Sequence, residues 1–200
     1  PIYEELKEIL KNSDNIVFFG GAGVSTESGI PDFRSEKGLY NARQDYGRSP
    51  EEMLSADFFD GDPVTFFDYY KKNLIATWAK PNDAHKALAK LEDMGKLKAV
   101  ITQNIDGLHQ MAGSKAVYEL HGSVHRNRCR RCGRAYGLEY ILDDENCKDA
   151  FGKTDGVPRC SCGGIVKPEV VLYGEMLDED CIRASVDAIS KADTLIIGGT

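Results

Sequence analysis

Four cysteines in two close pairs could bind a metal ion. The pairs are Cys129-x-x-Cys132 and Cys160-x-Cys162, with residues 133–159 between them. Four thiolates hold zinc in a closed tetrahedral site, which contributes on the order of 10–16 kcal/mol to the folding of small zinc peptides. The sequence therefore predicts a structural zinc on these four cysteines. A redox pair is the alternative function, and Cys147 is an alternative ligand because the second pair is one residue shorter than the usual spacing.

A glycine-rich loop follows the apolar run NIVFF and could bind phosphates. In the stretch GGAGVSTESGIPDFRS, Gly21 and Gly23 occupy the first two positions of a dinucleotide-binding fingerprint. Thr26 replaces the third glycine of that fingerprint, and Pro31 ends any helix that begins here. No acidic residue ends a second strand at the usual interval, so the loop alone predicts a nucleotide site only weakly.

Helices and strands that alternate along the chain must position these residues. The apolar pattern predicts helices over 3–11, 82–94 and 180–191, and strands over 15–19, 98–102, 117–120, 170–173 and 194–197. This order indicates an α/β fold with a mainly parallel sheet, in which ligands bind at the carboxyl ends of the strands. The polar clusters GAGVS, TQNID and HG follow the first three of these strands, so we expect them to converge.

Composition divides the chain into a larger α/β part and two inserts. Residues 36–81 carry aromatic residues at helical spacing, and residues 125–165 are rich in Arg, Cys and Gly. We assign 1–35, 82–124 and 166–200 to the larger part. The chain ends at GGT, directly after a predicted strand, so we expect further strands and helices of the sheet beyond position 200.

The overall charge bears on partners and location. The formal net charge of -7 argues against general nucleic-acid binding, and we interpret the basic stretch Arg126–Arg134 as an exposed solvated face. The apolar runs are much shorter than the roughly 20 residues of a membrane helix. The first residues, PIYEELKEIL, lack the pattern of a signal peptide, so we expect a cytoplasmic protein without membrane contact.

Taken together, the motifs resemble those of the sirtuins of the bacterial type. GAGVS with SGIPDFR, TQNID with LH, HG, the two cysteine pairs, VVLYGE and the final GGT occur in this order across nearly the whole chain. The resemblance implies a Rossmann-like parallel sheet with helices on both faces, plus a small domain made of the helical insert and the zinc-binding insert. It also implies an NAD-dependent protein-lysine deacylase in which NAD and the acylated peptide meet in the cleft between the domains.

The resemblance further implies an NAD site built from backbone, hydroxyl and amide groups. Asp106 would hold the nicotinamide carboxamide, and Asp32, Phe33 and Arg34 would form a mobile loop over the nicotinamide side. The full set of NAD-binding residues implied is Gly21, Ala22, Gly23, Ser25, Thr26, Asp32, Phe33, Arg34, Gln103, Asn104, Ile105, Asp106, Gly199 and Thr200.

His121 and Asn104 are the catalytic residues that the resemblance implies. A histidine suits reversible proton transfer near neutral pH. The acyl-lysine carbonyl oxygen would attack the ribose carbon that nicotinamide leaves, giving an O-alkylimidate. His121 would then activate a ribose hydroxyl, and water would finally release free lysine and O-acyl-ADP-ribose. We expect the other histidines, His85, His109 and His125, to be structural or surface residues.

Substrate binding is implied for a strand and two aromatic positions. Val170, Val171, Leu172 and Tyr173 would pair with the peptide backbone as an added strand, and Val171 and Phe33 would help to line the acyl-lysine tunnel. Relatives that prefer succinyl or malonyl lysine carry Tyr and Arg three residues apart in the helical insert. Here Tyr70 is followed by Asn73, so we expect an uncharged acyl group, most simply acetyl.

Two other classes of function remain open at this point. An ADP-ribosyltransferase or an NAD hydrolase would use nearly the same pocket without needing an acylated peptide. A zinc-ribbon interaction module would use the basic stretch Arg126–Arg134 and would not turn over NAD.

Overall fold

The computed structural model describes residues 2–32, 43 and 45–200, and the chain divides into two compact units. Unit 1 comprises Pro1–Asp32, Trp78–His121 and Leu177–Thr200, and unit 2 comprises Phe33–Thr77 and Gly122–Met176. The sequence assigned 166–200 to the larger part, whereas the structure places 166–176 in unit 2.

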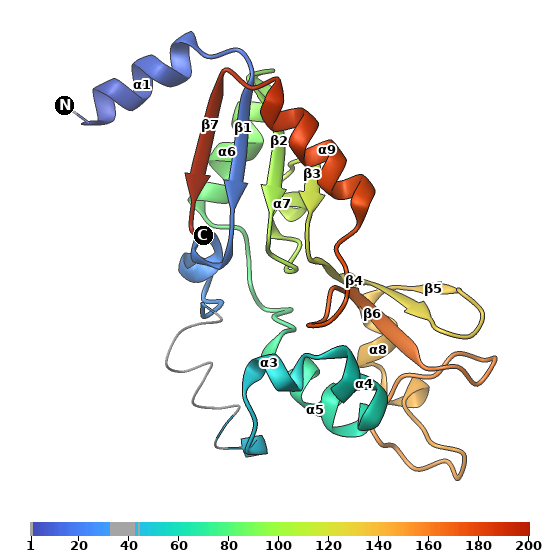
Figure 1. The fold of residues 1–200 in the computed structure, drawn as a ribbon. Coiled ribbons are helices and arrows are strands. Elements are labelled where there is room, and N and C mark those ends of the chain that lie inside the picture. The colour runs from blue at the N-terminus through green and yellow to red at the C-terminus, as the bar shows by residue number, and fades with distance from the viewer. Residues whose placement is uncertain (1, 33–42, 44) are drawn as a thin grey trace. The chain divides into compact units, whose positions relative to one another are not determined.

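Unit 1 is built on a parallel sheet of four strands in the order β3-β2-β1-β7 (Figure 1). The strands are β1 (Ile16–Gly20), β2 (Leu97–Thr102), β3 (Val117–Glu119) and β7 (Thr194–Gly198). The register aligns Phe18 with Val100 on one side and with Ile196 on the other. All four strands therefore end at the same edge, where the polar clusters begin.

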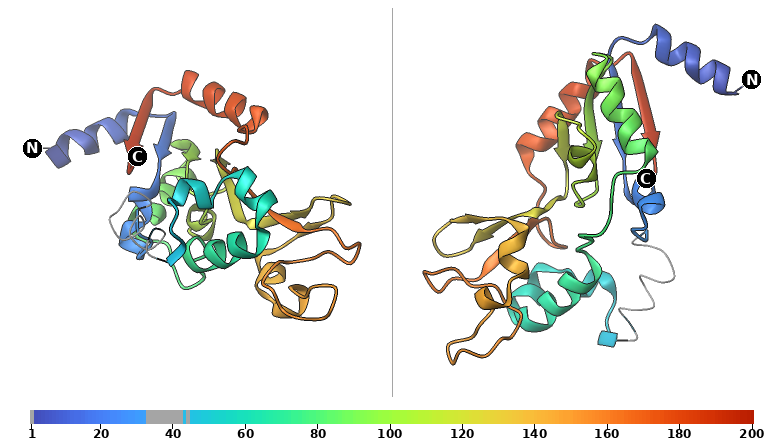
Figure 2. Two further views of the ribbon diagram at one scale, coloured as in Figure 1. Left: turned by 60° about the horizontal axis from the view of Figure 1, so that its bottom comes forward. Right: turned by 180° about the vertical axis from the view of Figure 1, so that it is seen from behind.

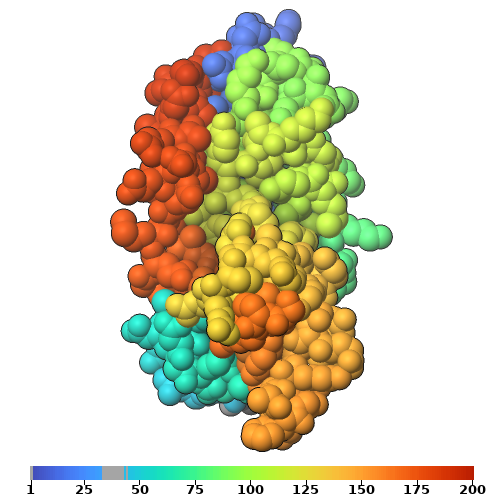
Figure 3. Space-filling view, turned by 90° about the vertical axis from the view of Figure 1, so that its right-hand side faces the viewer, coloured from blue at the N-terminus to red at the C-terminus, as the bar shows by residue number. Residues whose placement is uncertain are grey.

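Helices cover both faces of this sheet (Figures 1 and 2). Alternate residues of β1 point to opposite faces. Ile16 and Phe18 pack with Leu88 of α6 (Asp83–Asp93), whereas Val17 packs with Ala188 of α9 (Glu179–Ser190) on the other face. Figure 3 shows the unit from the β3 edge, with α9 in red on one side and α6 in green on the other. The predicted α/β fold is confirmed.

The first helix of unit 1, α1 (Ile2–Asn12), has no buried residue. A lysine holds its C-terminal end, because Lys96 Nζ donates hydrogen bonds to the carbonyl oxygens of Leu10, Lys11 and Ser13 at 3.1, 2.9 and 2.8 Å. These carbonyls lie at or just beyond the helix end, where backbone acceptors lack partners within the helix. Lys96 directly precedes β2, so these hydrogen bonds hold the C-terminal end of α1 beside the start of that strand.

Unit 2 contains three short helices around an aromatic core. They are α3 (Pro50–Met53), α4 (Ala56–Gly61) and α5 (Pro63–Asn73), and each begins after a residue whose side chain accepts a backbone N–H. Phe59, Phe66, Phe67 and Tyr70 are almost fully buried and pack ring against ring. This confirms the predicted helical character of the residues between 50 and 73.

The rest of unit 2 is organised by an antiparallel sheet in the order β5-β4-β6. Its strands are β4 (Gly122–Cys129), β5 (Ala135–Tyr136) and β6 (Val166–Val170), and α8 (Leu138–Leu142) follows β5. The prediction of a strand over 170–173 was wrong, because the strand lies over 166–170 and pairs with β4. Beyond it, Tyr173 forms an isolated bridge with Ser55.

Among the residues that the structure describes, no helix is both long enough and apolar enough to cross a bilayer.

Candidate active site

The glycine loop lies against the end of β7. Gly23 N–H donates to the carbonyl oxygen of Gly199 at 2.8 Å, and a Cβ on Gly23 would lie only 2.8 Å from Gly199 Cα. The residues after Gly21 form a short 3-10 helix, Ala22–Ser28. Thr26, at the position of the missing third glycine, is exposed and donates its hydroxyl to Gly23 O at 2.9 Å. The side chain at this position therefore stabilises the loop itself.

Gly23→Ala is expected to weaken NAD binding about tenfold. The added methyl group would force apart two backbone segments, at a cost typical of overpacking of about 1–3 kcal/mol. Isothermal titration of NAD into the variant measures the change. Gly61→Ala is the control, since a Cβ at Gly61 meets nothing within 4 Å. Equal affinity of Gly23→Ala and wild type would contradict the role of this close approach.

Polar side chains from the loop and from the end of β2 form one hydrogen-bonded network. The buried Ser25 donates its hydroxyl to Asp106 Oδ2 at 2.6 Å. Asn104 Nδ2 donates to the carbonyl oxygen of Gly21 at 2.9 Å and to Ser25 Oγ at 3.3 Å. Asp106 Oδ1 in turn accepts the backbone N–H of Leu108 at 2.9 Å. The predicted convergence of GAGVS and TQNID is therefore observed.

His85 extends this network, although its sequence position gave no indication of that contact. Its Nδ1 accepts the backbone N–H of Asn82 at 3.2 Å, so in the neutral ring the proton lies on Nε2. That Nε2 faces Ser25 Oγ at 3.5 Å. Burial lowers the pKa of His85. His85 therefore presents an N–H to Ser25 and directs the serine hydroxyl toward Asp106.

His109 is a second buried histidine beside the network. Its ring centroid lies 4.8 Å from that of His85, and neither ring nitrogen has a hydrogen-bond partner among the described residues. Burial, together with the neighbouring His85, lowers the pKa of His109 to about 4, and Asp106 opposes this shift only in part. The ring is thus neutral in the folded chain at pH 7. His85 and His109 are buried as structural residues, whereas His125 is exposed.

His109 is expected to make folding stability fall as the pH drops from about 6.5 to 4. In this window the unfolded chain binds a proton on His109 and the folded chain does not, which costs about 3 kcal/mol at pH 4. Urea unfolding at pH 7 and pH 4 should show this loss in wild type and less of it in His109→Leu. His125→Leu should retain the wild-type pH dependence. An identical pH dependence in His109→Leu would count against the assignment.

His121 lies just beyond β3, with its ring orientation fixed by the backbone. Nδ1 is 2.9 Å from the carbonyl oxygen of Gln103. Because a carbonyl can only accept, Nδ1 carries the proton and Nε2 is left as the basic nitrogen of the neutral ring. Gln103 itself is fixed, since its N–H donates to Gly20 O and its Oε1 accepts the Thr200 hydroxyl, each at 2.9 Å. The ends of β1, β2 and β7 are joined through Gln103.

The structure places the remaining predicted NAD residues as follows. Ala22 and Ile105 are partly buried, and Asp32, Gly199 and Thr200 are exposed. Phe33 and Arg34, predicted for the loop over nicotinamide, lie outside the described residues.

The predicted substrate residues lie in unit 2. Val170 ends β6, Val171 is half-buried and Leu172 is buried. Tyr173 is half exposed and borders an open groove of about 490 Å³ with Arg48, Glu51 and Phe58 among its lining residues. Tyr70 lies instead in the aromatic core, stacked on Phe66 at 5.7 Å, and burial raises the pKa of its hydroxyl.

The four predicted zinc ligands converge in unit 2. Their sulfur atoms all lie within 4.8 Å of one another, with 3.5 Å between Cys129 and Cys162 and 3.6 Å between Cys132 and Cys160. Tetrahedral zinc with four thiolates needs about 3.8 Å between sulfurs, so the donor set fits a structural zinc. The shorter second pair closes its turn through Gly163 N–H to Cys160 O, as Gly133 N–H to Cys129 O does in the first.

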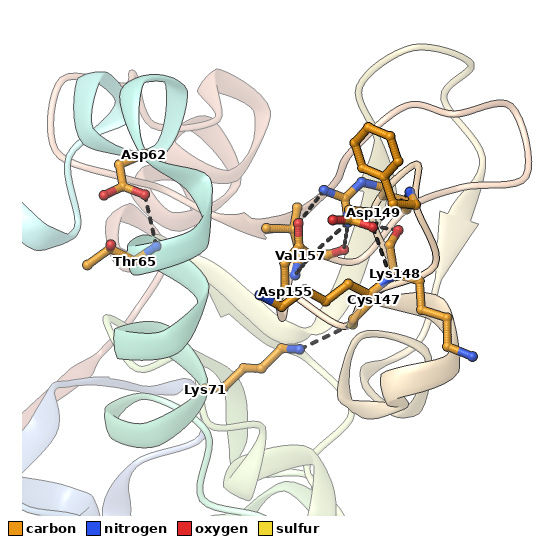
Figure 4. A network of polar contacts seen from close by, with 11 residues as sticks. Asp62, Thr65, Lys71, Cys147, Lys148, Asp149, Asp155 and Val157 are labelled. Atoms are coloured by element: carbon orange, nitrogen blue, oxygen red, sulfur yellow. Dashed lines mark hydrogen bonds and ion pairs between the residues drawn. The ribbon is translucent and has the colours of Figure 1, made fainter.

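Cys147 is not a ligand in this arrangement. Its sulfur is buried, accepts a hydrogen bond from Lys71 Nζ at 3.3 Å and faces Ile141 O at 3.6 Å (Figure 4). Burial raises the pKa of this thiol. Cys147 therefore anchors the loop after α8 to α5.

The arginines of the basic stretch are engaged within unit 2. Arg128 Nε pairs with Glu169 at 2.6 Å, and Arg130 pairs with Asp60. Arg131 and Arg134 donate to Cys162 O and Ser161 Oγ, each at 2.8 Å, and so support the second cysteine pair. The arginines of this stretch are exposed, as predicted, and these contacts orient them on the surface of unit 2.

Three comparisons with known proteins agree with one another. Residues 21–200 match the model described as the Sir2 family. A curated protein of Clostridium perfringens, named NAD-dependent protein deacetylase, is 62% identical over 197 residues, which are 98% of this chain and 77% of that protein. A protein of the same name from Clostridium acetobutylicum is 58% identical with the same coverage.

Solved structures show the same similarity. One described as "Sir2 bound to acetylated peptide" is 37% identical, has a TM-score of 0.81 and matches 98% of this chain and 75% of its own. Another, described as a Sir2 homolog–NAD complex, is 38% identical with a TM-score of 0.81, and the match covers 98% and 72% of the two chains.

Proposed function

This chain belongs to the Sir2 family, the sirtuins, and is an NAD-dependent protein deacetylase; we propose that it yields nicotinamide, free lysine and O-acyl-ADP-ribose, with His121 as general base. The observation that carries the assignment of the base is the bond between His121 Nδ1 and the Gln103 carbonyl oxygen. It fixes the tautomer and leaves Nε2 ready to accept a proton.

We assign NAD binding to the groups at the carboxyl ends of the strands of unit 1. The 3-10 helix Ala22–Ser28 begins beside these ends, and its backbone N–H groups suit phosphate oxygens. Asp106 is held by the Ser25 hydroxyl and the Leu108 N–H. These two donors orient the carboxylate, which we assign to the nicotinamide amide.

NAD supplies an electrophilic ribose carbon when its bond to nicotinamide breaks. The residues of this chain must then hold the ribose and move one proton. Asn104 is oriented by Gly21 O and Ser25 Oγ and lies at the proposed ribose site. His121 Nε2 takes a proton from a ribose hydroxyl, which makes that oxygen nucleophilic toward the acyl carbon. Zinc on the four cysteines stabilises unit 2 and takes no part in these proton transfers.

We assign the acylated peptide to the segment 170–173, where backbone pairing would recognise many sequences. The backbone of Tyr173 is already bonded to Leu54 and Ala56, so this pairing would use the residues before it. An uncharged acyl group, acetyl above all, fits the absence of an arginine at Asn73, whose amide donates instead to Tyr69 O at 2.9 Å. A cytoplasmic location fits four cysteines that bind zinc and two further thiols, Cys147 and Cys181, since cytosolic cysteines stay reduced.

Nicotinamide release tests the proposed function. We expect the chain to release nicotinamide from NAD when an acetyl-lysine peptide is present and to release little without it. Equal release without peptide would indicate an NAD hydrolase. Release that depends on a protein acceptor, with ADP-ribose attached to it, would indicate an ADP-ribosyltransferase.

A further inference from the structure

A tyrosine hydroxyl contacts one of the four zinc-binding sulfurs. Tyr136, in β5, donates its hydroxyl to Cys160 Sγ at 2.9 Å. We propose that Tyr136 is a positioning residue for the zinc site. Its hydroxyl holds the Cys160 sulfur in place as a ligand and so slows release of the metal. This role concerns retention of zinc and goes beyond the proposed deacetylation.

The Tyr136 ring is held in place by a second aromatic ring. Tyr136 stacks on Tyr140 of α8, with ring centroids 4.0 Å apart and an interplanar angle of 29°. The Tyr140 hydroxyl donates to the carbonyl oxygen of Arg159 at 2.9 Å. Arg159 directly precedes Cys160, so the two stacked rings contact consecutive residues of the chain, one through the backbone and one through the thiolate.

The residue before Cys160 is itself fixed. Arg159 N–H donates to Asn146 O at 2.8 Å, and its guanidinium forms two hydrogen bonds with the Asp155 carboxylate at 2.7 and 2.8 Å. Figure 4 labels Asp155 and Val157, which both accept hydrogen bonds from the Arg159 guanidinium. The backbone leading to Cys160 is therefore ordered without help from Tyr136, which leaves the sulfur as the group that the Tyr136 hydroxyl serves.

The hydrogen bond matters because of the charge at the metal site. Four thiolates around Zn²⁺ carry a net charge of -2, and a donor to a sulfur withdraws part of that charge. Cys129 Sγ accepts the backbone N–H of Arg131 at 3.4 Å, whereas Cys160 Sγ has the shorter bond from a phenol. Loss of zinc requires a sulfur to be displaced from the metal. The O–H that Tyr136 donates holds Cys160 Sγ in place and makes this displacement less favourable.

A pair of tyrosine variants separates the bond to sulfur from the stacking of the rings. Tyr136→Phe keeps the stack and removes only the hydroxyl on Cys160, and Tyr140→Phe removes a hydroxyl from the same stack that does not reach sulfur. We expect zinc transfer from the whole chain to a chromogenic chelator to be about tenfold faster in Tyr136→Phe, at the lower end of effects seen for groups that orient metal ligands. Tyr140→Phe should release zinc at nearly the wild-type rate.

Cobalt substitution gives a readout that altered packing would leave unchanged. The thiolate-to-cobalt charge-transfer bands should shift in Tyr136→Phe, because a sulfur loses its hydrogen bond, and should stay in place in Tyr140→Phe. Wild-type zinc release and wild-type cobalt bands in Tyr136→Phe would overturn the proposal. Equal acceleration by both variants would also overturn it, because the effect would then belong to the aromatic stack. Neither readout depends on deacetylase activity.

Discussion

His121→Ala is expected to lower the rate of lysine release by roughly 10²- to 10⁴-fold, the usual contribution of a general base. The variant should still exchange labelled nicotinamide into NAD in the presence of acetyl-lysine peptide. The reason is the order of the steps, since His121 acts on the ribose hydroxyl after nicotinamide has left. Parallel assays of lysine release and nicotinamide exchange measure the two effects separately.

His125→Ala is the matched control for this prediction. His125 lies four positions along the chain and is exposed, whereas the His121 ring is oriented by Gln103 O. We expect His125→Ala to retain both activities. If His121→Ala lost exchange as completely as lysine release, His121 would act at or before nicotinamide departure and its assignment as the later base would be wrong.

Cys160→Ser is expected to remove zinc and to unfold the cysteine-rich part of unit 2. A structural zinc contributes on the order of 10 kcal/mol to folding, more than any single contact described above. Residues 129–165 include only short elements, β5 and α8 among them, so the metal supplies much of their order. Metal analysis should fall from one zinc per chain to none. Limited proteolysis should then cut within 129–165.

Cys147→Ser tests whether Cys147 is a zinc ligand or a buried residue that anchors its loop. Its sulfur accepts a hydrogen bond from Lys71 Nζ, away from the four-sulfur cluster, so this variant should keep one zinc per chain. Cys181→Ser, in α9 of unit 1, should keep zinc and proteolytic resistance alike. Full zinc content in Cys160→Ser would show that the ligand set is wrong.

Much of unit 1 could be predicted from the sequence because its strands are apolar runs, and the central strands β1 and β2 are largely buried. Residues 98–102 and 194–197 read as apolar runs next to glycine or polar clusters, and parallel strands bring those clusters to one edge. The strand β6 could not be predicted in this way. Its sequence, VKPEV, contains Lys, Pro and Glu, and it becomes a strand through pairing with β4.

Some residues of the site could likewise be predicted from the sequence and others could not. Ser25, Asn104 and Asp106 were predictable because they follow strands that end together. His85 was not, because its contact with Ser25 depends on where α6 packs against the sheet, and no local pattern encodes that distance. Tyr136 was missed for a similar reason, since only the antiparallel pairing of β5 with β4 brings its hydroxyl to Cys160.

The identity of the products tests the proposed reaction most directly. Wild-type chain, NAD and an acetyl-lysine peptide should give nicotinamide, deacetylated peptide and O-acetyl-ADP-ribose in equal amounts, measured by mass spectrometry of one reaction. Free acetate and ADP-ribose as the first-formed products would contradict the account, because the acyl group would then have gone to water rather than to the ribose hydroxyl that His121 activates.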